Sequence, residues 1–211
     1  MELLQNVKNA VRYLYYLLNH HKYGNLDKSS RIAFNIKVSV KKNLYLNENT
    51  NIDAGAIIMN GRARFIMKKN SGSAIGLLAI TGNHISLPGV WFKQVTDSVK
   101  DRIDTNHEAD QDIVVEEDVW IGAHVTLLKG VTLGRGCEIG SWAVIRKDVP
   151  PYACVVGNPG KVVGFKFTPE EIAEHERALY PENERLPMSL IEKNYEKYYL
   201  RRIKEIKEYL K

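Results

Sequence analysis

The sequence predicts a mainly β protein, a parallel β-helix preceded by one helix and followed by further helices. The first observation is a six-residue period over residues 115–150, and the second is a weaker repeat of the same length over 26–61. The third is helical spacing of apolar residues near both ends of the chain. We therefore expect an N-terminal helix in residues 1–25, a β-helix domain in 26–167 and a helical extension in 168–211.

The N-terminal segment has one apolar face. Apolar side chains recur at intervals of three and four residues, at Leu3, Leu4, Val7, Ala10, Val11, Leu14, Leu17 and Leu18. This spacing predicts an amphipathic helix that packs on the flank or end of the β-helix, and Gly24 and Asn25 are suited to end it. The alternative is a helix lying on a membrane surface, but the polar face lacks the basic residues typical of such helices.

Residues 26–61 carry the weaker repeat. Its first positions are Phe34, Val40, Leu46, Ile52 and Ile58, and its fifth positions are Val38, Leu44, Thr50 and Ala56. We expect the first coils of the β-helix here, with these side chains turned inward. Between residues 62 and 81 the phase slips, so strands are expected there without a defined register.

The period disappears in an inserted loop at about residues 84–112. The segment is polar and irregular, and an insertion of this length in a compact repeat is usually functional or disordered. Trp91 and Phe92 favour a docked loop, because two large aromatic side chains are costly to leave in water.

The strong repeat follows. Every sixth residue is a branched aliphatic, and the fifth position of each block is small or apolar. The first positions are Val115, Ile121, Leu127, Leu133, Ile139 and Ile145, and the fifth are Val119, Val125, Val131, Cys137, Ala143 and Val149. Six residues form one short strand and a corner, and three such sides close a triangular coil whose first and fifth side chains point inward. Stacked coils pair their strands, which satisfies most backbone polar groups.

The C-terminal segment begins with a helix start signal. Thr168 is a candidate N-cap, Pro169 suits the first helical position, and Glu171 completes a capping box. We expect this helix to end near Tyr180 and a second amphipathic helix, with Ser189 as its candidate N-cap, to run to Leu210.

Composition limits the function classes. The net charge of +5 on 211 residues suits binding of an anionic small molecule such as a nucleotide cofactor. Nucleic acid is a weaker interpretation, because the sequence has no block of basic residues interleaved with aromatics. Two cysteines form neither a disulfide framework nor a metal-ligand spacing, so no metal is expected. Without a signal-peptide pattern or a long apolar run, we expect no membrane span and a cytoplasmic protein.

The sequence resembles the hexapeptide-repeat acyltransferases, most closely the branch of maltose, galactoside and xenobiotic O-acetyltransferases and the capsule and lipopolysaccharide acetyltransferases. The repeat itself carries the resemblance, together with VWIG at 119–122, KDVPP at 147–151 and VGNPGKV at 156–162. It covers about residues 26–167. It implies a left-handed β-helix, acetyl-CoA as the acyl donor, a homotrimer with active sites between subunits, and a sugar or another hydroxyl compound as acceptor, as in polysaccharide biosynthesis.

Acetyl transfer to a hydroxyl needs a base, and histidine suits that role. The chain has His20, His21, His84, His107, His124 and His175. The family's catalytic histidine lies where a strand gives way to the loop, and Thr81-Gly82-Asn83-His84 is similar to its surroundings. His84 is therefore the expected general base, while His107 and His124 are weaker candidates. Asn83 is expected to orient the loop or the substrate, or to serve only as a turn residue.

The resemblance also implies a donor groove between neighbouring coils. Backbone groups of Gly122, Ala123, Ser141 and Trp142 are expected to meet the pantetheine arm. Three cations, Arg146, Lys147 and Lys161, are candidates for the phosphates, although each would also suit a solvated surface. Trp120 is expected near the wall of the donor site as a substrate-binding residue, or else as an anchor on the surface of the coil. Trp142 departs from the small residue common in the family, so it either narrows the groove or stacks on the cofactor.

The sequence is compatible with three other functions. The alternatives are a non-catalytic hexapeptide-repeat binding or scaffold protein, an N-acetyltransferase of an amino sugar, and a γ-class carbonic anhydrase, which shares the coil. The last would need several metal-ligating histidines spaced across coils. The sequence does not identify the acceptor.

Overall fold

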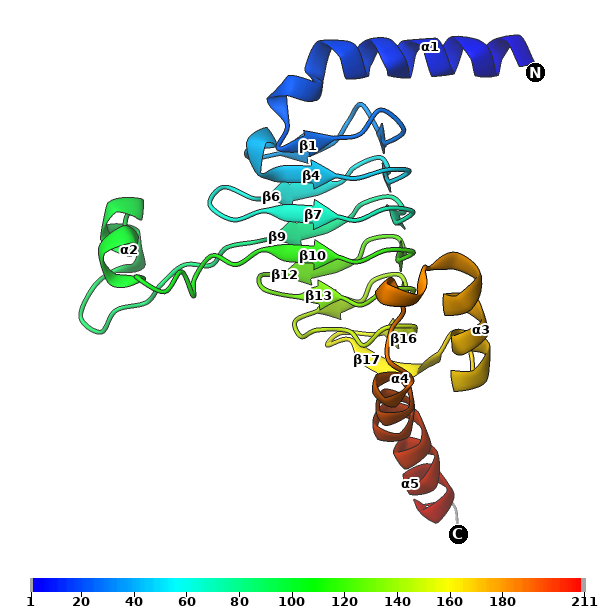
Figure 1. The fold of residues 1–211 in the computed structure, drawn as a ribbon. Coiled ribbons are helices and arrows are strands. Elements are labelled where there is room, and N and C mark those ends of the chain that lie inside the picture. Colours follow the sequence, from blue (N-terminus) through cyan, green and yellow to red (C-terminus); the bar gives the residue numbers. More distant parts are fainter. Residues whose placement is uncertain (1, 210–211) are drawn as a thin grey trace.

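The protein is a triangular stack of parallel coils, seen in a computed structural model that describes residues 2–209 (Figure 1). The first sheet contains, in spatial order, β1 (Asn25–Leu26), β4 (Leu44–Leu46), β7 (Phe65–Met67), β10 (Ile113–Val115) and β13 (Thr132–Leu133). The second contains β2 (Arg31–Ile32), β5 (Asn51–Ile52), β8 (Gly72–Ser73), β11 (Trp120–Ile121), β14 (Glu138–Ile139), β16 (Ala153–Val156) and β17 (Lys161–Phe165). The third contains β3 (Lys37–Val38), β6 (Ile57–Met59), β9 (Leu78–Ile80), β12 (Thr126–Leu128) and β15 (Val144–Ile145).

All neighbouring strands are parallel except the last pair of the second sheet, β16 and β17. Each coil contributes one strand to each sheet, so the chain returns to the same face after three short strands. This is the arrangement that the six-residue period predicts. Among the described helices, none combines the length and hydropathy that a membrane span requires.

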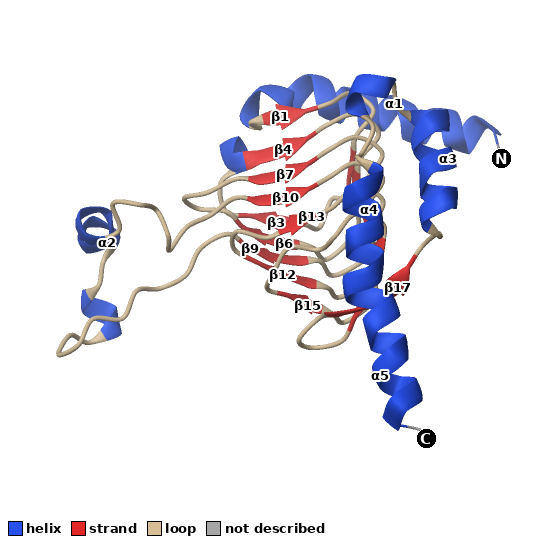
Figure 2. Ribbon diagram, turned by 60° about the horizontal axis from the view of Figure 1, so that its bottom comes forward, coloured by secondary structure: helices blue, strands red, loops and turns tan. Residues whose placement is uncertain are grey.

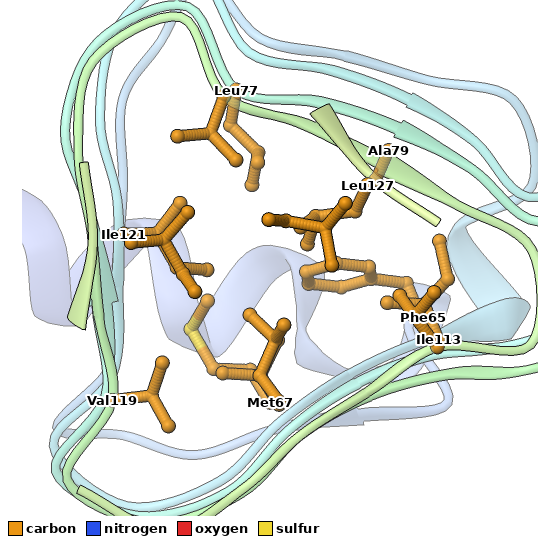
Figure 3. Packing of buried hydrophobic residues seen from close by; sticks show 14 of the residues in the cluster. Phe65, Met67, Leu77, Ala79, Ile113, Val119, Ile121 and Leu127 are labelled. Atoms are coloured by element: carbon orange, nitrogen blue, oxygen red, sulfur yellow. The ribbon is translucent and has the colours of Figure 1, made fainter. Parts of the chain in front are cut away.

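The inward register of the strong repeat is confirmed. Its first-position and fifth-position side chains, from Val115 to Val149, are all buried, with at most 6% of their surface exposed. Figure 3 shows three of them, Val119, Ile121 and Leu127, pointing into the coil together with Phe65 and Met67 of the preceding coil.

The predicted register of the first coil is wrong. Phe34 is 80% exposed, and the side chains packed on the core are Leu26, Ile32 and Val38. Leu46 follows Val38 by eight residues instead of six, because the corner between them contains the 3₁₀ turn Lys41–Asn43. The two additional residues change the phase, and the prediction for Leu46, Ile52 and Ile58 holds after that corner.

The core contains one polar defect. Ser73 points inward at the position that Ile52 and Ile121 fill in the adjacent coils, and its buried hydroxyl has no hydrogen-bond partner among the described residues. Ser71, two residues earlier, is also buried, but its hydroxyl donates to the Glu116 carbonyl (2.6 Å) and accepts from the Val119 N–H (3.0 Å).

We expect Ser73→Ala and Ser71→Ala to have opposite effects on stability. Ser73→Ala removes an unsatisfied buried hydroxyl and should raise the unfolding free energy by about 1 kcal/mol, whereas Ser71→Ala leaves the Val119 N–H unpaired and should lower it by about 1–3 kcal/mol. Denaturant titration of the two variants measures both changes. A loss of stability in both would show that the Ser73 hydroxyl has a hydrogen-bond partner in solution.

Helix α1 (Glu2–Asn19) crosses the N-terminal end of the coil, and a 3₁₀ turn (His20–Lys22) connects it to β1 (Figure 1). Tyr15 and Tyr16 pack against the core, and the hydroxyl of Tyr15 lies 2.8 Å from that of Tyr23. The helix therefore lies on the end of the coil, but the prediction that its apolar face packs there is wrong within a single chain. Val7, Val11, Leu14, Leu17 and Leu18 are all about half exposed.

The insertion forms an arm, residues 81–112, that contains the 3₁₀ turn Phe92–Gln94 and helix α2 (Asp97–Ile103). Figures 1 and 2 both show it projecting from the coil on the side opposite α3. Trp91 is 80% exposed and Phe92 is 59% exposed. The prediction that these aromatics dock the loop is therefore wrong within a single chain.

A series of ion pairs joins the coil before the arm to the coil after it. The pairs are Arg62–Asp110 (2.9 Å), Arg64–Asp112 (2.6 Å), Lys68–Glu116 (2.8 Å) and Lys69–Glu117 (3.5 Å), each separated by 48 residues in the sequence. Each exposed pair contributes little stability by itself. Together they favour one register of β10 on β7, so the arm leaves and re-enters the coil at a defined place.

The C-terminal helices pack along the second sheet and beyond the end of the coil (Figure 2). Helix α3 (Pro169–Leu179) has the predicted capping box, in which Thr168 accepts from the Glu171 N–H. A 3₁₀ turn (Glu182–Glu184), α4 (Met188–Tyr195), a π-helical turn (Glu196–Leu200) and α5 (Arg201–Tyr209) follow. The N-cap of α4 is Pro187, so the prediction that Ser189 is the N-cap is wrong. The predicted end of the last helix, Leu210, lies outside the described residues.

Helix α3 is fixed to the coil by a buried carboxylate. Glu176 is 2% exposed, accepts from the Tyr152 hydroxyl (2.5 Å) and pairs with Arg135 (2.9 Å). Burial and the contact with Glu176 raise the pKa of Tyr152 well above its usual range, so its hydroxyl remains a donor at neutral pH.

Candidate functional site

His84 lies at the neck of the arm. Strand β9 ends at Ile80, and the departing and returning segments then pair through two backbone hydrogen bonds, Asn83 N–H to Ala109 (2.8 Å) and Gln111 N–H to Thr81 (2.9 Å). Gly82 is needed here, because a Cβ at that position would lie 2.2 Å from an oxygen of Asp110. The neck therefore holds the backbone just before His84 while the arm extends beyond it.

The His84 side chain is exposed, and neither ring nitrogen has a hydrogen-bond partner among the described residues. Its ring meets Phe92 edge-on, with 6.0 Å between centroids, and its backbone N–H donates to the side-chain oxygen of Asn83 (2.9 Å). His84 and Asn83 line a cavity of about 640 Å³, together with Arg62 and Lys100. An imidazole with free nitrogens beside a cavity can accept a proton from a bound hydroxyl.

The four donor-groove candidates are brought together. Gly122 and Ala123 follow β11, while Ser141 and Trp142 occupy the same corner one coil later. Their N–H groups are largely used within the coil, however, with Gly122 N–H donating to Ile139 (2.8 Å), Ala123 N–H to the Ser141 hydroxyl (3.2 Å) and Trp142 N–H to Ala123 (2.9 Å). A ligand at this corner would therefore meet mainly carbonyls and side chains.

Trp142 stacks on His124, with 4.4 Å between ring centroids and 22° between ring planes. Both residues have left-handed backbone angles, φ of 64° and 56°, and Trp142 is 70% exposed. Gly76 lies beneath His124, where a Cβ would be 2.3 Å from the ring. Such angles are unfavourable for bulky residues, and the stack makes His124 part of this corner rather than a free base.

The three candidate cations also share one site. Arg146, Lys147 and Lys161 line a cavity of about 360 Å³ at the C-terminal end of the coil, next to Tyr198. All three are exposed, and none forms an ion pair with another described residue. Their positive charge is therefore available to an anionic ligand.

Trp120 lies on β11 and is 52% exposed. It lines a smaller cavity of about 210 Å³ with Gly122, Ser141 and Val156. Trp120 is therefore beside the donor-groove candidates, and it does not line the cavity that contains His84.

The base and the donor candidates lie apart in a single chain. The cavity of His84 and Asn83 contains none of the seven donor candidates. His107 lines yet another cavity, of about 460 Å³, with Arg62, Asp110 and Asp112. Within residues 2–209, no group of three or more His, Cys, Asp or Glu side chains is placed to hold a metal ion.

The charged residues of the neck were not among the residues predicted from the sequence. Lys100 and Asp110 are buried, and they lie with Arg62 in the cavity beside Asn83. The spacing contained a signal, because basic residues at 62, 64, 68 and 69 precede acidic residues at 110, 112, 116 and 117 by a constant 48 positions.

Comparisons with known proteins identify relatives of this chain. The bacterial transferase hexapeptide family (six repeats) matches residues 112–147. A chloramphenicol acetyltransferase of Klebsiella aerogenes is 32% identical over 175 residues, which cover 81% of this chain and 75% of that protein.

Two solved structures show the same fold, the left-handed parallel β-helix. A maltose O-acetyltransferase from Clostridium difficile 630 has a TM-score of 0.56 at 24% identity, covering 69% of this chain and 71% of that one. A hexapeptide-repeat acetyltransferase from Vibrio cholerae O1 biovar eltor, complexed with acetyl-CoA, has a TM-score of 0.52 at 23% identity, covering 71% and 75%.

Proposed function

Because the chain belongs to the hexapeptide-repeat acetyltransferases, we propose that it transfers an acetyl group from acetyl-CoA to a hydroxyl of a sugar or related small acceptor, with His84 as general base. The observation that carries the proposal is the exposed imidazole at the arm neck, which lies beside a cavity of about 640 Å³ and whose ring nitrogens form no hydrogen bond with any described residue. That volume is in the range of small-molecule sites.

The chemistry assigned to His84 is proton transfer. As the acceptor oxygen attacks the thioester carbonyl, an imidazole nitrogen takes the hydroxyl proton, and the protonated ring then supplies a proton to the departing thiolate of coenzyme A. The acetyl group leaves sulfur and becomes bonded to the acceptor oxygen. Asn83 contributes by holding the His84 backbone N–H through its side-chain oxygen.

We assign donor binding to the two other groups of residues. Arg146, Lys147 and Lys161 would hold phosphates, since they present unpaired positive charge to one cavity. Gly122, Ala123, Ser141 and Trp142 would line the pantetheine path, with Trp120 at its wall. Comparing the affinity for coenzyme A with that for its form lacking the 3′-phosphate tests whether these cations bind that phosphate. Equal affinities would show that they do not.

The arrangement favours a homotrimer with the site between subunits. The third sheet presents a mainly apolar outer face, formed by Ile57, Met59, Leu78, Ile80, Leu128 and Val144. Burying such a face by three-fold packing would also bring the exposed Trp91 and Phe92 of one arm against a neighbour and His84 near another chain's donor groove. Light scattering should give the mass of three chains, and a monomer mass at micromolar concentration would contradict this.

The direct test is a thiol-release assay with acetyl-CoA against a panel of sugars, amino sugars and chloramphenicol. Release of coenzyme A that depends on a hydroxyl acceptor, with the acetyl ester identified by mass spectrometry, would support the proposal. Acetylation confined to amino groups would favour an N-acetyltransferase of an amino sugar. Binding of acetyl-CoA without turnover on any acceptor would favour a non-catalytic binding protein.

A further inference from the structure

Lys100 is a buried lysine on the arm helix α2. Only 8% of its surface is exposed, although most of the arm around it is open to water. A lysine is rarely buried unless its ammonium group is paired, because removal of the charge from water is costly. Its surroundings therefore hold it in one place.

The Lys100 ammonium group reaches back from α2 to the neck. It donates to the backbone carbonyl of Asn83 (2.9 Å) and pairs with Asp110 (2.6 Å). The same Asp110 oxygen accepts from the Arg62 guanidinium (2.9 Å), and Arg62 also pairs with Asp101 of α2. The helix, the departing segment and the returning segment are therefore joined by one charged cluster.

The carbonyl that Lys100 holds belongs to the peptide unit between Asn83 and His84. The other end of that unit is the His84 N–H, which donates to the Asn83 side chain (2.9 Å), and the preceding N–H is bonded to Ala109 (2.8 Å). The peptide plane just before His84 is thus restrained at both its carbonyl and its N–H. Within residues 2–209 the imidazole contacts the Phe92 ring but has no hydrogen-bond partner, so its orientation depends largely on the backbone that carries it.

We propose that Lys100 is a positioning residue for His84, which sets the direction of the base through the Asn83 carbonyl and couples it to the arm helix. This proposal rests on the proposed function, in which His84 is the general base. Without the ammonium group, the Asn83–His84 peptide loses a restraint and Asp110 keeps only Arg62 as a partner. Since a misplacement of about 1 Å can cost roughly a hundred-fold in rate, we expect a large effect on turnover.

The test is Lys100→Met, which keeps most of the side-chain length and removes the charge. We expect turnover to fall about ten- to a hundred-fold with little change in KM for acetyl-CoA, since the donor candidates line other cavities. Arg102→Met is the matched control, because Arg102 is exposed on the same helix, and it should retain wild-type turnover. Lys100→Arg keeps a cationic donor and should recover part of the loss.

A double variant separates positioning from a structural role. If Lys100 acts through His84, the Lys100→Met/His84→Ala double variant should turn over as slowly as His84→Ala alone. Independent losses that multiply, wild-type turnover of Lys100→Met, or no recovery in a folded Lys100→Arg would each overturn the proposal. Wild-type turnover of His84→Ala would instead overturn the proposed function, so the two failures are distinguishable.

Discussion

Replacing His84 by alanine should lower the turnover number by about a hundred- to ten-thousand-fold, the usual contribution of a general base. A sugar hydroxyl is a poor nucleophile at neutral pH, so removal of its proton during attack is the step that most needs assistance. The affinity for acetyl-CoA should remain near that of the wild type, because His84 lines a cavity that contains none of the donor candidates. Steady-state kinetics at saturating acceptor and a direct measurement of coenzyme A binding check both parts.

His107→Ala is the control for this experiment. His107 is also exposed on the arm, but it lines a different cavity with Arg62, Asp110 and Asp112. It should therefore retain most of the activity. If His107→Ala were inactive and His84→Ala active, the base would lie within the arm and not at its neck.

Val125→Asp should prevent the coil from folding stably. Val125 is fully buried in a corner, between Leu77 of the preceding coil and Ala143 of the following one, which are both fully buried as well. Val125 belongs to a cluster of buried hydrophobic side chains, and burying an unpaired carboxylate among them costs several kcal/mol. That cost is a large part of the stability of a typical domain.

Val156→Asp makes the same substitution on the outside of the coil and serves as the matched control. Val156 lies on β16 and is 45% exposed, so a carboxylate at this position remains hydrated. Thermal denaturation followed by circular dichroism should show a strongly lowered transition, or no folded protein, for Val125→Asp and a nearly unchanged one for Val156→Asp. Equal melting temperatures would mean that residue 125 does not face the core.

The sequence by itself determined the β-helix, because its short strands and corners need only local information. Each six-residue block contains its own inward aliphatic, as Ile121 and Leu127 do, and successive blocks make equivalent contacts. The capping box of Thr168 and Glu171 was predictable for the same reason, since both partners lie within one helical turn. The position of His84 where the repeat gives way to the arm was also predictable, because the loss of the period is visible locally, whereas its role as general base stays a prediction.

The tertiary structure decided the features that depend on residues distant in sequence. The first coil has the same six-residue period as the next, at Leu26, Ile32 and Val38, but two additional residues at the corner before Leu44 separate the two phases, and only the structure shows that Phe34 is exposed. The cations Arg146 and Lys161 line one cavity only because the turn before β17 lies against β15, where the Gly160 N–H donates to the Val144 carbonyl (2.9 Å). In the sequence Lys100 is one of many charged residues in a polar loop. Only the folded structure shows that α2 places its ammonium group at the neck, where it donates to the Asn83 carbonyl. The physical reason is that a period records which way each side chain points, whereas pairing of charges and hydrogen bonds depends on where the separate segments come to lie.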